Sequence, residues 1–514
     1  MIYPVEAFTA AERERLRPHF TNLDQPVFAV VGLPETTKAA LFARYSRYPG
    51  TLRRLFLDEF ADAAGAPAVA ESERAAALLD RVFVGYGDDS VAQLGGAHIA
   101  CEYVSNVVTK VLERPRLAGY LEQSTRYIAY DEPVPGLGYR YYRGPDLGPA
   151  YERAMDSLFE TYAAMLPRVA AWIEARFARN AADPPNAHAR AVRAKALDLV
   201  RGVLPAASLS HVGIFASGQT YEQLILHLTA HPLPEARRYG ELILEAVRAV
   251  IPSFVARVDQ PDRGGAWSAY LEHRDATAIA VAERLGLRGG DTAGPSVTLL
   301  HAHGYEREAL GALLFEATTV SEQQAVARVA DLDDEQVTEL FAELVGERPN
   351  RRHRPGRGLE SLHYRFEIVS DYGAFRDLQR HRMLTVQWQS LTPDLGAGVP
   401  EELDAAGVGD AYRAALERSA ATYRALDGPQ AAYALCLGFR IRYILDLNAR
   451  EAMHVIELRS GREGHPGYRA VAHELHRLIA TVHPRVAAAM HHVDTSVEPR
   501  LERIAAELRS ERAR

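Results

Sequence analysis

The chain has 514 residues, of which 47% are hydrophobic and 25% are charged, and its formal net charge is -8. This length is more than one ordinary hydrophobic core needs, so a soluble globular protein of two or three domains is expected. The negative charge argues against a general nucleic-acid binder, because such proteins neutralise phosphates with clustered basic side chains.

The two cysteines and the distribution of apolar residues indicate the compartment. Cys101 and Cys436 lie in apolar segments without metal-ligand spacing, so we expect two reduced, buried thiols and a cytoplasmic protein. The sequence has no apolar run long enough to span a bilayer and no signal-peptide pattern, so neither a membrane span nor secretion is expected. No metal site is expected either.

Hydrophobic periodicity, glycines and prolines predict the elements in chain order. After a polar lead-in at 1–24, the expected strands are 26–34, 97–104, 296–300 and 363–369. The expected helices are 36–48, 50–63, 71–85, 105–112, 275–285, 306–318, 334–344, 372–379, 410–426, 431–459 and 468–481. The segment 147–257 is predicted to be helical, with breaks at prolines 184, 185, 232 and 234.

A short basic motif occurs twice. Arg380-His381-Arg382 is followed after seven residues by Ser390, and Arg114-Pro115-Arg116 is followed after seven residues by Ser124. The arginines are separated by 380 − 114 = 266 positions and the serines by 390 − 124 = 266 positions. This repeat predicts an α/β (α+β) fold of two tandem domains, each a small mixed sheet packed with helices. The boundaries expected are a lead-in at 1–24, repeat 1 at 25–257, a linker at 258–294, repeat 2 at 295–492 and a charged tail at 493–514.

The Arg-His-Arg motif with its later serine resembles the signature of the flavin-dependent thymidylate synthases, the ThyX family. Three further segments are similar to this family: Glu122-Gln123-Ser124-Thr125-Arg126-Tyr127, Arg201-Gly202-Val203-Leu204-Pro205, and the stretch from Asn448 through Arg450 and His454 to Arg459. The resemblance implies an enzyme that methylates dUMP to dTMP. It also implies FAD as cofactor, with NADPH and methylenetetrahydrofolate as co-substrates.

The resemblance also implies roles for individual residues. Residues matching FAD contacts are Arg380, His381, Arg382, Asn448, Arg450, His454 and Ser90. Residues matching nucleotide ligands are Glu122, Ser124, Arg126, Arg201 and Ser390. Arg459 matches the arginine that polarises the uracil ring, where a fixed cation would lower the pKa of the N3 proton.

Each half of the chain departs from the family pattern at different places. In the second half, Trp388 replaces a glutamate and Thr392 replaces an arginine. In the first half, Pro115 replaces the histidine, and Leu228 and Thr229 fall at the place of the uracil arginine. We therefore expect one composite site built from both halves, and self-association into a dimer of two-domain chains.

Two other functions remain open at this point. One is a flavin- and nucleotide-dependent enzyme with a different pyrimidine substrate, because Trp388 and Thr392 reshape the nucleotide loop. The other is a binding protein of the same fold without catalysis, since a fold does not fix a function. Flavin absorbance of the purified protein separates the enzymes from the binding protein.

Overall fold

A computed structural model describes residues 6–24, 28–45, 48–61, 91–181, 183–287, 289, 294–496 and 501–512. The chain forms two compact units, each discontinuous in sequence. The first unit comprises Met1–Val104, Val111–Gln123 and Ser210–Arg288, and the second comprises Ser105–Lys110, Ser124–Leu209 and Gly289–Arg514. The second unit therefore combines parts of both predicted repeats. The repeat boundaries concern which segments were duplicated, and they stay a prediction.

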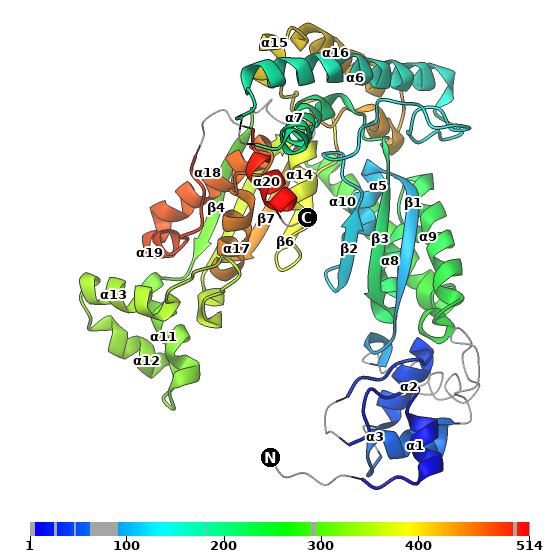
Figure 1. Cartoon of the computed structure of the whole chain (residues 1–514), viewed down its shortest axis with the longest axis vertical. Coiled ribbons are helices and arrows are strands. Elements are labelled where there is room, and N and C mark those ends of the chain that lie inside the picture. The colour runs from blue at the N-terminus through cyan, green and yellow to red at the C-terminus, as the bar shows by residue number, and fades with distance from the viewer. Residues whose placement is uncertain are drawn as a thin grey trace. The chain divides into compact units, whose positions relative to one another are not determined.

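The first unit contains a three-stranded sheet in the order β1-β3-β2. Its strands are β1 (Gly96–Ser105), β2 (Ala118–Glu122) and β3 (Leu209–Ser217), and β2 pairs antiparallel with β3. Figure 1 shows α8 (Gly218–Thr229) and α9 (Pro234–Arg248) alongside this sheet, and α10 (Ala266–Arg284) packs on α8. Among the described residues, the other α-helices of this unit are α1 (Ala10–Leu16), α2 (Glu35–Tyr45) and α3 (Leu52–Leu55).

The second unit contains a four-stranded antiparallel sheet in the order β4-β5-β7-β6. Its strands are β4 (Ser296–His303), β5 (His363–Asp371), β6 (Thr385–Trp388) and β7 (Arg440–Asn448). Helix α17 (Ala449–Arg459) packs against β7, and α18 (Pro466–Val482) packs against β4 and β5 (Figure 1). Side chains of β7 alternate, with Ile441, Tyr443, Leu445 and Leu447 buried, as expected for a strand with one face on the core.

Most of the other described α-helices of the second unit form two groups. One group packs α6 (Gly148–Arg176) against α7 (Pro185–Val200) and α16 (Gly409–Arg424), with α20 (Ile504–Arg512) on α7. The other group consists of α11 (Glu306–Leu314), α12 (Glu322–Ala330) and α13 (Asp334–Val345). Shorter helices are α14 (Tyr372–Leu378), α15 (Glu401–Ala405) and α19 (Pro484–Ala488), and α5 (Asn106–Leu112) follows β1. No described helix is both long and apolar enough to cross a membrane.

The sheets confirm the internal repeat. The order β1-β3-β2 corresponds to β5-β7-β6, and each first strand runs directly into a short helix, α5 or α14. These helices begin at Asn106 and Tyr372, and this offset is the same as the separation of the two basic motifs. Helix α8 begins after the capping residue Ser217, and helix α17 begins after the capping residue Asn448. Fewer positions separate these two caps than separate the starts of α5 and α14. The first copy is therefore the longer one between these two landmarks, in the part that holds α6 and α7.

Within the second unit, equivalent segments of the two copies meet around a local two-fold axis. The Ala206 N–H donates to Leu435 O at 2.7 Å, and the Leu437 N–H donates to Leu204 O at 2.8 Å. Pro205 and Cys436, the central residues of these two segments, pair in a β-bridge. The number of positions between them equals the number between the caps of α8 and α17. Each copy thus donates to the other through equivalent positions, as in an isologous contact between subunits.

Several expected elements were wrong. The segment 147–257 is not wholly helical, because β3 lies at Leu209–Ser217, and the expected helix 431–459 contains β7 before α17 begins. The expected strand at 26–34 is reduced, within residues 28–34, to one bridge between Phe20 and Val30. The loops after α5 and α14 carry the short strands β2 and β6. The expected helix at 71–85 lies outside the described residues.

Candidate functional site

The second unit holds most of the residues that the sequence singles out. Glu122 lies on β2 of the first unit, where it is buried, and Ser90 lies outside the described residues. Ser124 is half-buried and accepts the Arg126 N–H at 3.2 Å, whereas Ser390 is exposed just after β6. The arginines and histidines described next therefore form the candidate site.

Arg126 is held by a carboxylate on α7 and by a tyrosine on α18. Its Nε and Nη2 donate to the two oxygens of Asp198 at 2.6 Å each, and its Nη1 donates to Tyr468 Oη at 3.0 Å. Burial alone would lower the pKa of Arg126, but the charge and hydrogen bonds of Asp198 raise it above its ordinary value. This bidentate pair fixes the plane of the guanidinium, because two parallel bonds leave it no rotation.

Arg201 and Arg459 come from the two different copies and approach the same carboxylate. Asp377 Oδ2 lies 3.8 Å from Arg201 Nη1, and Asp377 Oδ1 lies 3.8 Å from Arg459 Nη1. Burial by itself would raise the pKa of Asp377, but the surrounding arginines, Arg201 first, lower it to about 2. Asp377 is therefore a carboxylate at neutral pH that links the two arginines.

Arg459 also binds His381. The Arg459 Nε donates to His381 Nε2 at 2.9 Å. A guanidinium has donors only, so Nε2 must carry its lone pair and the single ring proton must lie on Nδ1. Burial and the nearby charge of Arg459 lower the pKa of His381 well below its ordinary value, so the ring is neutral at physiological pH.

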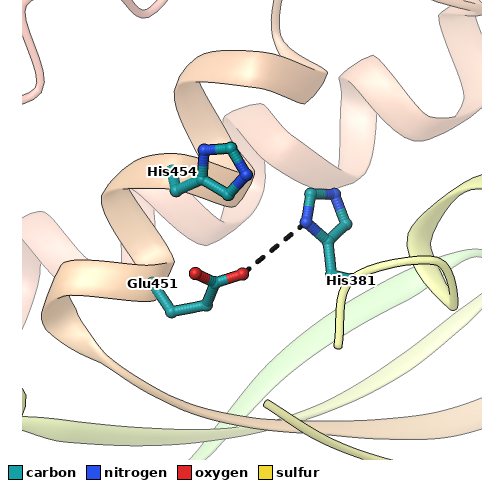
Figure 2. Close-up of side chains that lie close together, drawn as sticks. All are labelled: His381, Glu451 and His454. Atoms are coloured by element: carbon teal, nitrogen blue, oxygen red, sulfur yellow. Dashed lines mark ion pairs between the residues drawn. The ribbon is translucent and has the colours of Figure 1, made fainter. Parts of the chain in front are cut away.

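Glu451 and His454 of α17 lie next to His381, as Figure 2 shows. The Glu451 Oε1 lies 3.7 Å from His381 Nδ1, and the rings of His381 and His454 are 5.6 Å apart in a T-shaped arrangement. One ligand atom from each of the three residues lies within 4.8 Å of the others. Burial raises the pKa of Glu451 and lowers that of His454 to about 4. The three groups are spaced closely enough for a divalent cation, although the sequence suggested no metal.

A cavity of about 270 Å³ opens beside Arg201 in the second unit. Its polar lining includes Lys195, Asp198, Arg201, Asp371 and His465. The Nη2 of Arg201 is buried and has no hydrogen-bond partner among the described residues, and the side chain is only 4% exposed. A buried nitrogen of a charged group is costly to leave unpaired, so this atom indicates a place for an anionic oxygen.

A glycine allows this approach of the guanidinium. A Cβ placed on Gly373 would lie 3.2 Å from Arg201 Nη2 and 3.0 Å from Asp371 Oδ1. A side chain there would push both groups away by a few tenths of an ångström, so the glycine lets the backbone at the start of α14 lie close to the arginine.

The remaining residues that match flavin contacts are partly engaged with the protein. Asn448 Oδ1 accepts the Glu451 N–H at 2.9 Å as the cap of α17. Arg450 donates to Pro355 O at 2.9 Å and lies 3.3 Å from Glu360. Arg380 and Arg382 are half-buried. Guanidinium groups and neutral imidazoles are a donor set suited to a phosphorylated ligand, so the chemistry of these residues fits a dinucleotide cofactor.

Four residues of this site were not recognised from the sequence. Asp198 and Asp377 neutralise the arginines, Tyr468 contacts Arg126, and Glu451 faces His381. Only Glu451 had a local signal, because it stands three positions before His454 on one helix and therefore shares its face. The others come together through long-range packing that no local pattern reports.

Comparisons with known proteins agree with the repeat and the motifs. A family model described as "Thymidylate synthase complementing protein" matches residues 38–253 and again residues 307–485. A UPF0159 protein of Chlamydia pneumoniae is 36% identical over 96% of this chain and 97% of its own length. A UPF0159 protein of Chlamydia muridarum is 35% identical over 95% and 96%, and one of Thermoplasma acidophilum is 28% identical over 92% and 98%.

Proposed function

Because the chain belongs to the thymidylate synthase complementing protein family, we propose that it is a flavin-dependent enzyme that methylates dUMP to dTMP. FAD, when bound, carries hydride from NADPH, and methylenetetrahydrofolate supplies the one-carbon unit. Arg380, His381, Arg382, Asn448, Arg450 and His454 would hold the flavin nucleotide. The protein's part is then binding, orientation and electrostatics, as in other cofactor enzymes.

One observation carries this proposal: arginines from both copies converge within a single compact unit. Arg201 of the first copy and Arg459 of the second share Asp377, and Arg126 and Arg459 both lie against the ring of Tyr468, at 5.8 Å and 5.3 Å. In the first copy, Leu228 and Thr229 fall at the place of the uracil arginine. In the second copy, Thr392 stands at the place of Arg126, and Ala432 falls near that of Arg201. A nucleotide held at both ends must therefore touch both copies.

The roles of the three arginines follow from their surroundings. Arg201 lines the cavity, and its buried Nη2 has no hydrogen-bond partner among the described residues, so a phosphate oxygen beside it would satisfy this donor. Arg126 already donates to both oxygens of Asp198, so it would shape the phosphate site mainly through its charge. Arg459 would face the pyrimidine, where its charge stabilises the deprotonated N3.

The test is a binding and turnover measurement on the purified protein. We expect flavin absorbance, binding of dUMP, and NADPH oxidation that dUMP stimulates. Arg201→Ala should weaken dUMP binding by about tenfold to a hundredfold, because a charge-assisted hydrogen bond is worth about 1.5–3 kcal/mol. Arg442→Ala is the matched control, since Arg442 pairs with Glu367 on the sheet.

Two other outcomes would change or refute the proposed function. Bound flavin without dUMP-dependent turnover would favour a different pyrimidine substrate, in line with Trp388 and Thr392 in the nucleotide loop. A folded protein that binds neither flavin nor nucleotide would refute the proposal.

A further inference from the structure

The contacts of His381 determine which of its two ring nitrogens carries the proton. The Arg459 Nε–H occupies the Nε2 lone pair of His381 at 2.9 Å, which puts the ring proton on Nδ1. The Nδ1 side faces Glu451, whose Oε1 is 3.7 Å away and whose residue is only 4% exposed. A carboxylate, an imidazole and a guanidinium therefore follow one another, and Figure 2 shows the first two.

Glu451 is itself held in place. It lies in the first turn of α17, where its backbone N–H binds the capping Asn448, and its other oxygen, Oε2, lies 3.7 Å from Arg354 Nη1. A fixed negative charge next to Nδ1 stabilises a proton on that nitrogen. In other histidine sites, the partner of one ring nitrogen likewise determines which nitrogen carries the proton.

We propose that Glu451 is a positioning residue. Its carboxylate holds His381 in the Nδ1–H tautomer, so that Nε2 can accept from Arg459 and fix the guanidinium on its Nε side. The ligand would then meet Arg459 on its Nη side, where Nη1 lies 3.8 Å from Asp377. The inference rests on the proposed function only for the identity of that ligand, a pyrimidine nucleotide.

The same three residues of Figure 2 could instead be ligands of a divalent cation, since their ligand atoms lie within 4.8 Å of one another. A metal on His381 Nδ1 would need that lone pair and would move the proton to Nε2. Two N–H groups, those of His381 and Arg459, would then face each other at 2.9 Å. A cation would also be placed beside Arg354 and Arg459, so the described geometry favours the positioning role.

The first experiment tests which of the two ring nitrogens of His381 contributes to ligand binding. His381→Gln places an amide oxygen near the position of Nε2, whereas the shorter side chain of His381→Asn reaches only the position of Nδ1. With dUMP as the probe, we expect His381→Asn to bind about tenfold more weakly than His381→Gln, because only the asparagine variant lacks the hydrogen bond to the charged Arg459. Equal losses in the two variants would overturn the proposal.

The second experiment asks whether Glu451 acts through His381. Glu451→Gln should weaken dUMP binding in the wild-type background and have no further effect in the His381→Gln background, because glutamine has no tautomer to set. Additive losses in the two backgrounds would mean a merely structural role and would overturn the proposal. Glu367→Gln, which removes a carboxylate paired with Arg442 on the sheet, is the matched control and should leave binding unchanged.

A third measurement does not depend on the proposed function. In protein labelled with 15N-histidine, His381 should show one protonated nitrogen, Nδ1, and Glu451→Gln should give a mixture of tautomers. A wild-type protein that does not bind dUMP but shows the Nδ1–H tautomer refutes the proposed function and leaves this inference standing. Protonation at Nε2 would overturn the inference, and so would a stoichiometric transition metal that His454→Ala removes.

Discussion

At the scale of single residues, the site is organised by one carboxylate among several guanidinium groups. Asp377 lies 3.8 Å from both Arg201 and Arg459, and the charges of Arg380 and Arg126 also lower its pKa. Without a negative charge at this place, the arginines would repel one another in a partly desolvated environment, where such interactions are stronger than in water. Asp377 thus keeps together the groups that a nucleotide would use.

This arrangement predicts the effect of Asp377→Asn on stability. The folded protein lowers the pKa of Asp377 from 3.8 to about 2. A lowered carboxyl pKa contributes stability that is present above about pH 4 and lost as the pH falls towards 2. At pH 7 the substitution should cost about 2 kcal/mol, and the difference from wild type should shrink below pH 4.

Urea unfolding of both proteins at pH 7 and across pH 2–4 measures this. Asp446→Asn removes a more exposed partner of Arg365 on the sheet and should cost less than about 1 kcal/mol. An Asp377→Asn protein as stable as wild type at pH 7 would contradict the role given to this carboxylate.

At the scale of elements, the sequence predicted the short helices before both basic motifs, but not the central strands that follow. Helices α5 and α14 were located correctly, since each follows a predicted strand and precedes a basic turn. Strands β3 and β7 were interpreted as helix because they run directly into α8 and α17. The alternation in β7 was visible, with Ile441 and Tyr443 separated by a polar residue, yet its Leu- and Arg-rich surroundings favoured a helix.

Much of the candidate site could be predicted, but not how its charges are satisfied. The resemblance to the family identified Arg126, Arg201 and Arg459, because motif residues stand at fixed spacing along the chain. Their partners Asp198 and Asp377 stand far from Arg126 and Arg459 in the sequence, on helices α7 and α14. Such pairs are made by tertiary packing, and neither composition nor periodicity indicates them.

Helix α20 illustrates an element that is held mainly by ion pairs. None of its residues is buried, and it packs on α7 through Arg190, which pairs with Glu507 and Glu511 at 2.5 and 2.7 Å. Just before it, Glu502 binds Lys195 at 2.7 Å, and both of these residues line the cavity next to Arg201. This helix therefore depends on charge to stay against the cavity.

We expect salt to loosen α20 selectively. Raising the ionic strength from about 0.1 M to 1 M shortens the Debye length from about 10 Å to about 3 Å, which weakens exposed pairs. Hydrogen exchange at residues 504–512 should become several-fold faster, while α18, with Tyr468, Val471 and Leu475 buried, should not change.

A variant tests the same point at low salt. Arg190→Gln should mimic the effect of salt on α20, whereas Arg413→Gln, which removes the pairs with Asp404 and Asp410, should not. Unchanged exchange of α20 in high salt and in Arg190→Gln would show that apolar packing holds this helix.

At the scale of the whole molecule, the duplication explains why one chain can hold a site that identical subunits would otherwise share. Segments 202–207 and 433–438 pair across a local two-fold axis, with Pro205 opposite Cys436. In an oligomer of identical chains, both copies must keep every site residue. In a duplicated chain, each copy can lose the residues that the other supplies, which fits the proposed loss of the uracil arginine from the first copy and of the phosphate arginines from the second.

A subunit-mixing experiment tests whether the composite site belongs to one chain. Arg126 and Arg459 lie in the same unit of the same chain, and both contact Tyr468. We therefore expect Arg126→Ala and Arg459→Ala each to lose most dUMP binding and dUMP-stimulated NADPH oxidation. Mixing the two variants should restore neither property, since every chain in the mixture still lacks one of the two arginines.

The mixture must be shown to exchange subunits if the protein self-associates, for example by co-purification of differently tagged chains. Refolding the two variants together provides the exchange if assembled subunits do not separate. Given exchange, a site assembled across two chains would recover part of the wild-type activity, because some mixed oligomers then combine an intact Arg126 with an intact Arg459. Recovery would therefore refute the single-chain site while leaving the composite site in place. Full binding and activity in either variant alone would refute the composite site itself. The reason is that the equivalent position in the other copy holds no arginine that could replace the one removed.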